Sequence, residues 1–518
     1  MPIRALQLAG ILAVLMFTFA APAFAASKNV ELMKQLPEAK NATAINFLDY
    51  KHQGDVMLVT GRFGLKSYSL RDPANPVLLD EFTAEDLRLR GDPPVDFSPD
   101  AAPRSTFWQN EDMDVDRKRK LALLSRDPRA YAGSTSREPG EPDPNGATNI
   151  AGVYVIDAKD PRRLRLVSFQ QLPTGHTTTC VNECRWLWTG GPASTTTQRD
   201  TRGWTFGRPI IVTDLSNPSK PRAFPMDPVD LFRRDGVTAY SHDVQVDAAG
   251  IAWVSGDGGT RGYWTDGRHY DPVEGRNRQA TALEPIPYAG GGLAQAETND
   301  ATGGFEHNAW RPVGRSAPRG DARYRRGELL LATEEDFGPA ADGCRNQGKF
   351  TIASLEGSYG GEAWRSTPQS PFRLKTVGSW SPYGQEGTRR GPYPPLADFC
   401  SAHYFDVDGS TVSYAWYGEG TRFLDISDPA NPTQFAYWRP DDGIVWASYL
   451  HKGYVYTADR TRGVDVLRLT GGASAARSSG RDVAVAAPSA RQRRFLARVA
   501  TRFKPDPGTS FLCVIETG

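Results

Sequence analysis

The chain carries no excess charge of one sign and no long apolar run in its body. Its 61 basic and 60 acidic residues give a formal net charge of +1 over 518 residues. A balanced charge creates no general field for nucleic acid or for a strongly acidic partner. Beyond residue 25, no stretch reaches the roughly 18 consecutive apolar residues that a transmembrane helix needs. The sequence therefore predicts neither a nucleic-acid-binding protein nor a multispanning membrane protein.

Common sequence signatures of catalysis are also missing. The chain contains no GxSxG nucleophile elbow, no Walker phosphate-binding loop and no HExxH zinc motif. Histidine is scarce, with 7 residues, and so is cysteine, with 5. These absences argue against the usual serine hydrolases, P-loop nucleotidases and zincin proteases.

Turn-forming residues, in contrast, are abundant. The chain has 51 glycines and 39 prolines, with 39% hydrophobic, 10% aromatic and 23% charged residues. This balance is too apolar for a disordered polymer, and glycine has no collagen-like period. Many turn residues beside many aromatic ones favour short strands joined by turns. The length allows about two to four ordinary domains or one large repeat architecture.

The N-terminus has the pattern of a secretory signal. Basic Arg4, an apolar run over residues 11–21 and the small-x-small sequence Ala23-Phe24-Ala25 predict a cleaved signal peptide over residues 1–25. A retained membrane anchor is the alternative, but the apolar run is short for one. Residues 26–42 then form an N-terminal segment of the mature chain. We expect the protein to be secreted or to lie in the periplasm or cell envelope.

Residues 470–518 are expected to form a flexible linker and a basic C-terminal tail. Residues 470–490 are rich in Ala, Ser, Gly and Arg, as linkers are. From Arg491 to Lys504 the pattern is that of a short basic amphipathic helix, with Phe495, Val499 and Phe503 on one side. Such a helix can make a weak contact with an anionic membrane surface. A solvated flexible tail is the simpler interpretation.

Cysteine usage fits an exported protein, because disulfides persist outside the cytoplasm. Cys180 and Cys184 lie four residues apart and predict a small closed loop. Cys344 and Cys400 are the natural second pair, which leaves Cys513 free. The sequence alone does not fix this connectivity. Thiolate metal ligands are a less favoured alternative, because the CxxC spacing is missing.

One phrase recurs along the chain: an apolar strand, a turn with Asp-Pro or Asn-Pro, and a second apolar strand. It occurs near Leu70, Asp157, Asp214 and Asp425. An Asp or Asn side chain before Pro caps backbone amides and the Pro fixes φ, so each phrase predicts a β-hairpin. Another pair of short strands precedes the hairpin, most clearly in residues 402–426. Four consecutive antiparallel strands are the unit of a β-propeller blade.

The predicted fold is therefore all-β, a single β-propeller over residues 43–469 with four-stranded antiparallel blades. We expect seven blades, over residues 43–82, 106–171, 174–225, 239–290, 306–382, 400–440 and 443–469. The last unit has only about three strands. The N-terminal segment is expected to complete its sheet, which would remove exposed edges.

These repeats resemble the LVIVD-repeat family of bacterial β-propellers. The resemblance rests on the Asp-Pro hairpins, on Gly420 to Asp425 (GTRFLD) and on Gly463 to Leu467 (GVDVL), and covers roughly residues 43–469. The fourth unit lacks the hairpin phrase in register, and the fifth carries a long Gly-rich insertion. The resemblance implies the propeller fold and leaves the reaction open.

Four of the scarce histidines share one position in the repeat, at the start of the first strand of a unit. They are His176, His242, His307 and His403, and Glu111 takes the same register in the second unit. The first strand of a propeller blade lines the central channel. These five side chains should therefore meet near one mouth of that channel.

Imidazoles with a carboxylate suit a transition metal ion, and copper, zinc, iron and manganese are all chemically compatible. Glu334 and Glu335 follow His307 on the next strand and can add a ligand or orient a ring, and Asp243 is a further outer-shell candidate. The placement is also similar in topology to selenium-binding protein/methanethiol oxidase propellers, without a shared extended motif, and that resemblance implies a metal site served by histidines. Histidines at blade entry can alternatively hold neighbouring blades together. His52, His269 and His451 fall outside the register and are expected at the surface.

Two functions follow from these observations. The first is a metal-dependent secreted enzyme, an oxidoreductase acting on a small molecule in the central channel. The second is a non-catalytic scaffold at the cell surface that binds an envelope protein or a glycan through its long loops, 126–148, 190–207, 256–303 and 338–347. The fold alone does not choose between them.

Overall fold

The computed structural model describes residues 25–90, 92, 111–127, 150–172, 174–191, 210–224, 241–256, 259–293, 306–335, 348–359, 372–382 and 400–500. Residues 1–24 of the predicted signal peptide, Cys344, Cys513, the end of the predicted basic tail and most of the long loops lie outside the described residues.

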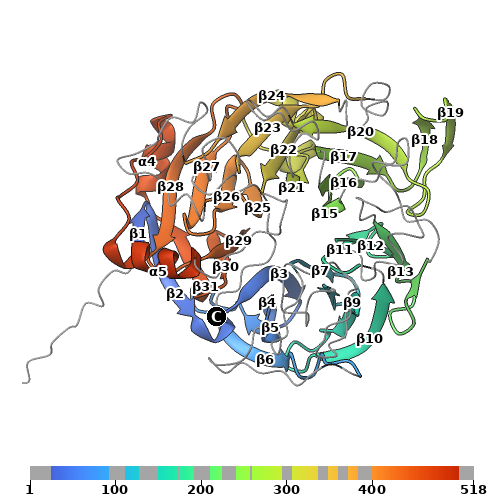
Figure 1. Cartoon of the computed structure of the whole chain (residues 1–518), viewed down its shortest axis with the longest axis horizontal. Coiled ribbons are helices and arrows are strands. Elements are labelled where there is room, and N and C mark those ends of the chain that lie inside the picture. The colour runs from blue at the N-terminus through green and yellow to red at the C-terminus, as the bar shows by residue number, and fades with distance from the viewer. Residues whose placement is uncertain are drawn as a thin grey trace, which may run out of the picture.

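Antiparallel sheets of four strands stand around a common axis and form a β-propeller (Figure 1). The first three sheets contain β3 (Ala42–Tyr50), β4 (Gly54–Gly61), β5 (Gly64–Ser69) and β6 (Val77–Thr83); β7 (Met113–Asp116), β8 (Leu121–Arg126), β9 (Ala151–Asp157) and β10 (Arg165–Leu172); and β11 (Thr177–Val181), β12 (Trp186–Gly190), β13 (Ile211–Asp214) and β14 (Arg222–Ala223). The predicted all-β fold of four-stranded antiparallel blades is confirmed.

The next two units join into one larger sheet. They contain β15 (Ser241–Val246), β16 (Ile251–Gly256), β17 (Gly259–Trp264) and β20 (Ile286–Leu293), followed by β21 (Glu306–Trp310), β22 (Leu329–Glu334), β23 (Phe350–Ser354) and β24 (Arg373–Trp380). The outer strands β20 and β24 pair in parallel, so these eight strands form a continuous sheet. A hairpin of β18 (Arg268–Asp271) and β19 (Arg276–Gln279) extends from the rim, and the short helix α2 (Ala322–Arg326) precedes β22.

The N-terminal segment closes the ring, as predicted. The last sheet contains β29 (Val445–His451), β30 (Tyr454–Asp459) and β31 (Gly463–Leu469), and β2 (Val30–Leu36) adds its outermost strand by pairing with β31. The preceding sheet contains β25 (Phe405–Asp408), β26 (Thr411–Ala415), β27 (Thr421–Asp425) and β28 (Thr433–Pro440), and β1 (Ala25–Lys28) pairs with β28. The two ends of the propeller are thus tied together by backbone hydrogen bonds.

The recurring Asp-Pro and Asn-Pro phrases form hairpins for the predicted reason. In each one, the side-chain oxygen before the Pro accepts a hydrogen bond from the backbone N–H two residues later. The acceptors are Asp72, Asp160, Asn217 and Asp428, at 3.0–3.1 Å. The hairpins are the third and fourth strands of their blades, for example β5 with β6 and β27 with β28. A local Asx turn therefore sets the register of the outer strands.

The core lies between neighbouring sheets rather than inside one of them. Large side chains fill these interfaces, and Trp188, Trp253, Trp380, Trp416 and Trp446 are fully buried. The Trp446 ring of β29 packs on the rings of His403 and Tyr417 from the preceding blade, with centroids 4.5 and 5.5 Å away. Burial of such rings is the main stabilising contribution of a propeller that lacks a central core.

Residues 470–490 differ from the flexible linker expected from their composition, whereas the amphipathic helix expected from Arg491 onwards is present. Residues 470–500 contain helices α4 (Gly472–Ser478) and α5 (Ala490–Ala500) beside the last two sheets (Figure 1). In α5, Gln492, Leu496 and Val499 are buried, and Gln492 Nε2 donates to the carbonyl of Gly418 at 3.1 Å. The apolar side of the amphipathic helix therefore packs on the propeller.

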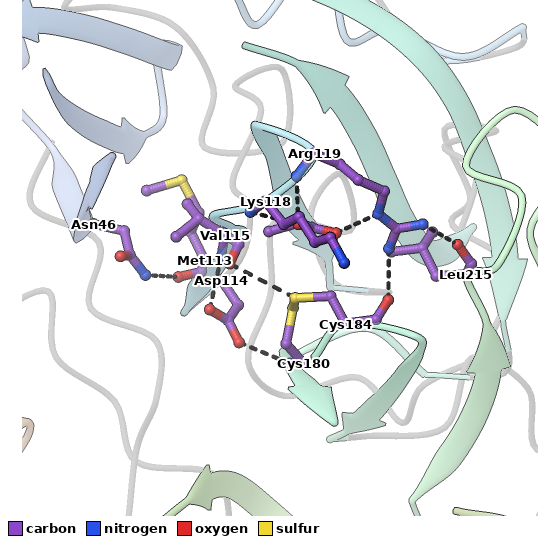
Figure 2. The surroundings of a disulfide bond; sticks show 10 residues. Asn46, Met113, Asp114, Val115, Lys118, Arg119, Cys180, Cys184 and Leu215 are labelled. Atoms are coloured by element: carbon purple, nitrogen blue, oxygen red, sulfur yellow. Dashed lines mark hydrogen bonds and ion pairs between the residues drawn. A yellow bond between two sulfur atoms is a disulfide. The ribbon is translucent and has the colours of Figure 1, made fainter. Parts of the chain in front are cut away.

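The predicted Cys180–Cys184 disulfide forms at the end of β11 (Figure 2). It closes a turn in which Asn182, Glu183 and Cys184 all have φ between 52° and 57°, a left-handed run that non-glycine residues rarely adopt. Arg119 ties the turn to the neighbouring blade by donating to the carbonyls of Cys184 and Leu215 at 2.6 Å. Cys400 is also disulfide-bonded, and its predicted partner Cys344 lies outside the described residues. These bonds are consistent with an extracellular location.

In the part of the chain that the structure describes, no helix combines the length and the apolar character that crossing a membrane requires.

Candidate metal centre

The innermost strands bring together the five side chains that share one position in the repeat. Strands β7, β11, β15, β21 and β25 each stand at the inner edge of a sheet, around the central axis (Figure 1). Glu111, His176 and His403 lie just before β7, β11 and β25, whereas His242 and His307 are the second residues of β15 and β21. All five are buried, with exposed fractions of 0–1%. We refer to them as the His–Glu cluster.

Two of the histidines sit on breaks in strand register. The pairing of β15 with β16 shifts between Ser241 and Asp243, and the pairing of β21 with β22 shifts between Glu306 and Asn308. His242 and His307 are therefore the unpaired residues of β-bulges. A bulge re-aims a side chain that regular pleating would direct elsewhere, and here it turns both imidazoles towards the cluster.

The ring nitrogens gather on the carboxylate of Glu111. Its Oε1 lies 2.8 Å from His403 Nε2 and 2.9 Å from His307 Nε2. Its Oε2 lies 3.0 Å from His176 Nε2, and that nitrogen lies 3.1 Å from His242 Nε2. One carboxylate thus contacts three imidazoles directly and reaches the fourth through His176.

Hydrogen bonds on the far side of three rings fix which nitrogen faces the cluster. His242 Nδ1 donates to the carbonyl of His307 at 2.9 Å, and His403 Nδ1 donates to the carbonyl of Trp446 at 2.6 Å. His176 Nδ1 lies 2.7 Å from the carboxylate of Asp127. Because these partners accept, the hydrogen of each neutral ring is on Nδ1. The Nε2 lone pairs therefore point at one another and at Glu111, as in histidines that bind a metal.

The ligand atoms form three overlapping groups in which every atom lies within 4.8 Å of the others. They are Glu111 with His307 and His403, Glu111 with His176 and His242, and His242 with His307 and Glu335. Donor atoms about 2.0–2.2 Å from one ion lie roughly 3.3–3.6 Å apart in a tetrahedral site and roughly 2.8–3.1 Å apart in an octahedral one. The 2.8–3.1 Å separations around Glu111 match the octahedral spacing and are also the distances of ordinary hydrogen bonds.

Burial and the contacts within the cluster shift the pKa values of its members in different directions. Burial opposes ionisation of Glu111, but His176 and His403 overcome this effect and hold its pKa well below the usual range. Burial and the neighbouring rings lower the pKa of His242 well below 6.5 and that of His307 to about 3. At neutral pH an ionised carboxylate thus faces at least two neutral imidazoles, the protonation states that metals require. His176 differs, because Glu111 and Asp127 outweigh burial and raise its pKa.

Comparison with known proteins finds remote structural likenesses and no family. No protein-family model matches the chain, and no curated protein matches it either. Among solved structures, the chain is similar to the β-propeller domain of Cps50 (Swd1) from Myceliophthora thermophila, with 10% identity and a TM-score of 0.45 over 85% of this chain and 100% of that one. It is also similar to virginiamycin B lyase from Staphylococcus aureus, with 8% identity and a TM-score of 0.41 over 86% of this chain and 99% of that one.

Sequence reasoning missed the acidic residue that supports His176. Asp127 directly follows β8, the second strand of its blade, and Glu335 directly follows β22, the second strand of another blade. Both are fully buried, and Glu335 accepts a hydrogen bond from the Tyr417 hydroxyl. An acidic residue immediately after the second strand of a blade therefore indicates a side chain near the cluster. Glu335 was predicted from its place near His307, and Asp127 can be found by the same register.

Two predicted outer-shell residues, Glu334 and Asp243, are not members of the metal-ligating groups of the described residues. The carboxylate of Glu334 accepts a hydrogen bond from the backbone N–H of Gly348 at 2.9 Å, because alternation along β22 turns it from its neighbour Glu335. Asp243 Oδ2 accepts from Gln245 Nε2 at 2.9 Å. Burial raises the pKa of Asp243 well above the usual value, and Asp112 adds to this effect.

The histidines outside the register take no part in the cluster. His52 is exposed, and His269 stacks on Trp264 with ring centroids 3.9 Å apart. His451 is partly buried and lies 2.7 Å from the carboxylate of Asp55, between the first and last blades. None of the three belongs to a metal-ligating group of the described residues.

Proposed function

We propose that this protein binds one transition metal ion in the His–Glu cluster. The observation that carries the proposal is the convergence of oriented lone pairs. His176, His242 and His403 present Nε2 to Glu111 or to each other at 2.8–3.1 Å, with Nδ1 held from behind. Such a set of lone pairs repels itself unless a cation lies among them. A protonated His176 is the alternative source of positive charge. The experiment below distinguishes a bound metal ion from a protonated His176.

The donor set restricts the ion to a borderline metal. Imidazole nitrogens suit zinc, copper and iron, and the carboxylate extends the choice to manganese. When bound, such an ion supplies Lewis-acid or redox chemistry to a small molecule. Within the chain, Asp127 and the carbonyls of His307 and Trp446 orient the rings, while burial excludes bulk water. We propose an oxidoreductase on this basis, and a non-catalytic cell-surface scaffold remains the competing function.

Metal analysis tests the proposal. The purified protein is stripped with a chelator, reconstituted separately with Zn²⁺, Cu²⁺, Fe²⁺ and Mn²⁺, desalted and analysed by mass spectrometry for metal content. We expect about one equivalent of the preferred ion in the wild type and His52→Ala and less than about 0.2 in His242→Ala and Glu111→Gln. The His52→Ala control removes an exposed histidine. A folded wild type that retains less than about 0.2 equivalents of every ion would leave the cluster as a hydrogen-bonded structural device.

The number of blades, the repeat family and the route of export are further proposals. We propose seven blades of the LVIVD-repeat type, supported by the succession of four-stranded units and by the Asx turns of the repeated hairpins. We also propose export through the signal peptide of residues 1–25, supported by the Cys180–Cys184 disulfide. N-terminal sequencing of the protein recovered from the envelope or the medium should then begin near Ala26.

A further inference from the structure

A cavity of about 390 Å³ runs along the innermost strands next to the His–Glu cluster. At the cluster end it is lined by Asp112, Asn308 and Tyr404, the residues that directly follow Glu111, His307 and His403. Its wall continues along the same strands to Asp114, Trp310 and Asp406. Because an extended strand advances about 3.3 Å per residue, the cavity begins one residue beyond the proposed ligands. Its size lies within the usual range for pockets that enclose a small molecule.

Aromatic side chains form much of the cavity wall. Phe47, Trp310, Tyr404, Phe405 and Tyr449 all line it. Tyr404 is almost completely buried, and its hydroxyl has no hydrogen-bond partner among the described residues. Aromatic faces attract organic cations through the ring quadrupole, and they also bury apolar groups of the same ligand.

Carboxyl groups are the main ionisable groups of the cavity wall. Asp112 lies just before β7, Asp114 lies in β7 and Asp406 lies in β25, and all three line the cavity. Asp114 accepts hydrogen bonds from the backbone N–H groups of Cys180 and Val115, and Asp406 from those of Leu450 and Val407. The blade-to-blade backbone contacts therefore hold these two carboxylates rigidly at the wall.

The cationic groups of the cavity wall only partly offset these carboxylates. Arg117 is exposed, and its guanidinium donates to the carbonyl of Phe47 at 3.0 Å. His451 is already paired with Asp55, at 2.7 Å. Three carboxyl groups and several aromatic faces therefore surround a space with little compensating positive charge.

We propose that this cavity binds a small organic ammonium ion, with its charge at Asp112 and its carbon skeleton against Trp310 and Tyr404. The inference rests on the proposed function in one respect, because the ligand would lie beside the metal and so be its substrate. The binding itself requires only the cavity, and it can be measured on protein without metal.

Calorimetric titration with a matched pair of probes tests the proposal. 2-Phenylethylamine and 2-phenylethanol have nearly the same shape, but only the amine is cationic at pH 8. We expect the wild type, stripped of metal with a chelator, to bind the amine at least about ten-fold more tightly than the alcohol. Asp112→Asn should remove this preference, and Trp310→Leu should weaken both probes. Asp408→Asn, an exposed carboxylate at the end of β25, is the control and should bind as the wild type does.

Equal affinity for the two probes, or no binding of either at about 10 mM, would overturn the proposal. Unchanged amine binding in both Asp112→Asn and Trp310→Leu would also overturn it, because the amine would then bind elsewhere. If Asp112→Asn does not fold, Trp310→Leu and the probe pair on the wild type still decide the matter. A protein that prefers the amine but retains no metal would keep this inference and refute the metal site, so the two proposals can fail separately.

Discussion

Replacing Asp127 by Asn changes the residue that orients His176 and leaves every proposed metal ligand in place. Asp127 Oδ2 lies 2.7 Å from His176 Nδ1, and both side chains are fully buried. Asn keeps the shape and can still accept the ring hydrogen through its amide oxygen. It removes the negative charge that makes the imidazole a stronger donor to a metal ion.

The expected effect can be worked out from binding linkage. Loss of such an outer-shell carboxylate weakens metal affinity by about 10–100-fold. At a free metal concentration of 100 times the wild-type Kd, binding stabilises the wild type by about 2.7 kcal/mol. The same concentration stabilises a 10-fold weaker variant by about 1.4 kcal/mol and a 100-fold weaker one by about 0.4 kcal/mol. Asp127→Asn should therefore lose about 1.3–2.3 kcal/mol of the metal-dependent stabilisation.

Urea unfolding with and without the preferred metal measures this difference. The matched control is Asp465→Asn, which removes a buried carboxylate that Arg462 and Trp438 contact on β31. It should lower the free energy of unfolding with and without metal alike, and leave the metal-dependent increment unchanged. If Asp127→Asn retains the full wild-type increment, the Asp127–His176 contact does not support a metal, and the ring orientation argued above has another cause.

Three further predictions concern stability. Replacing Cys180 and Cys184 by Ser together should lower the free energy of unfolding by about 2 kcal/mol, since even a short loop restricts the unfolded chain; urea midpoints under oxidising conditions measure this, and a loss below about 0.5 kcal/mol would contradict it. Burial opposes ionisation of Asp55, but the Lys452 ammonium group donates a hydrogen bond to its carboxylate and thereby lowers the pKa of Asp55. Asp55 therefore stabilises the fold above its unfolded pKa near 3.8, and this contribution is lost as pH falls below that value. Asp55→Asn should flatten the stability profile between about pH 5 and 3 by less than about 1 kcal/mol, and an unchanged acid slope would refute the assignment. Leu496→Ala should cost about 2–4 kcal/mol because α5 packs on the propeller, and undiminished resistance of α5 to limited proteolysis would argue against that packing.

Local patterns in the sequence predicted most of the fold, because propeller blades are built from local hairpins. The oxygens of Asp72 and Asp428 cap their turns two residues later, so the hairpin register is decided within a few residues of sequence. The repeat then predicted the succession of four-stranded sheets and the closure of the last sheet by β2. The parallel pairing of β20 with β24 was not predictable, since it joins outer strands far apart in sequence.

The C-terminal region shows where composition misleads. Residues 470–490 have the small polar residues of a linker, yet α4 lies within them and α5 begins at their end, and both helices pack on the last two blades. The apolar side of α5 was visible in the spacing of Phe495 and Val499. Whether that side would face solvent, a membrane or the propeller depended on what lay opposite, and the sequence of the helix does not contain that information.

The sequence by itself determined which residues could form a site, because four histidines and Glu111 share one position of a repeat and a repeat maps equal positions onto one level of a ring. Tertiary structure decided how they meet. The bulges at His242 and His307 re-aim their rings, and the acceptors behind His176 and His403 select the nitrogen that faces inward. The cavity beside the cluster exists only because the innermost strands of different blades, from β3 of the first to β29 of the last, surround it. Such features depend on contacts between blades, and no local stretch of sequence encodes them.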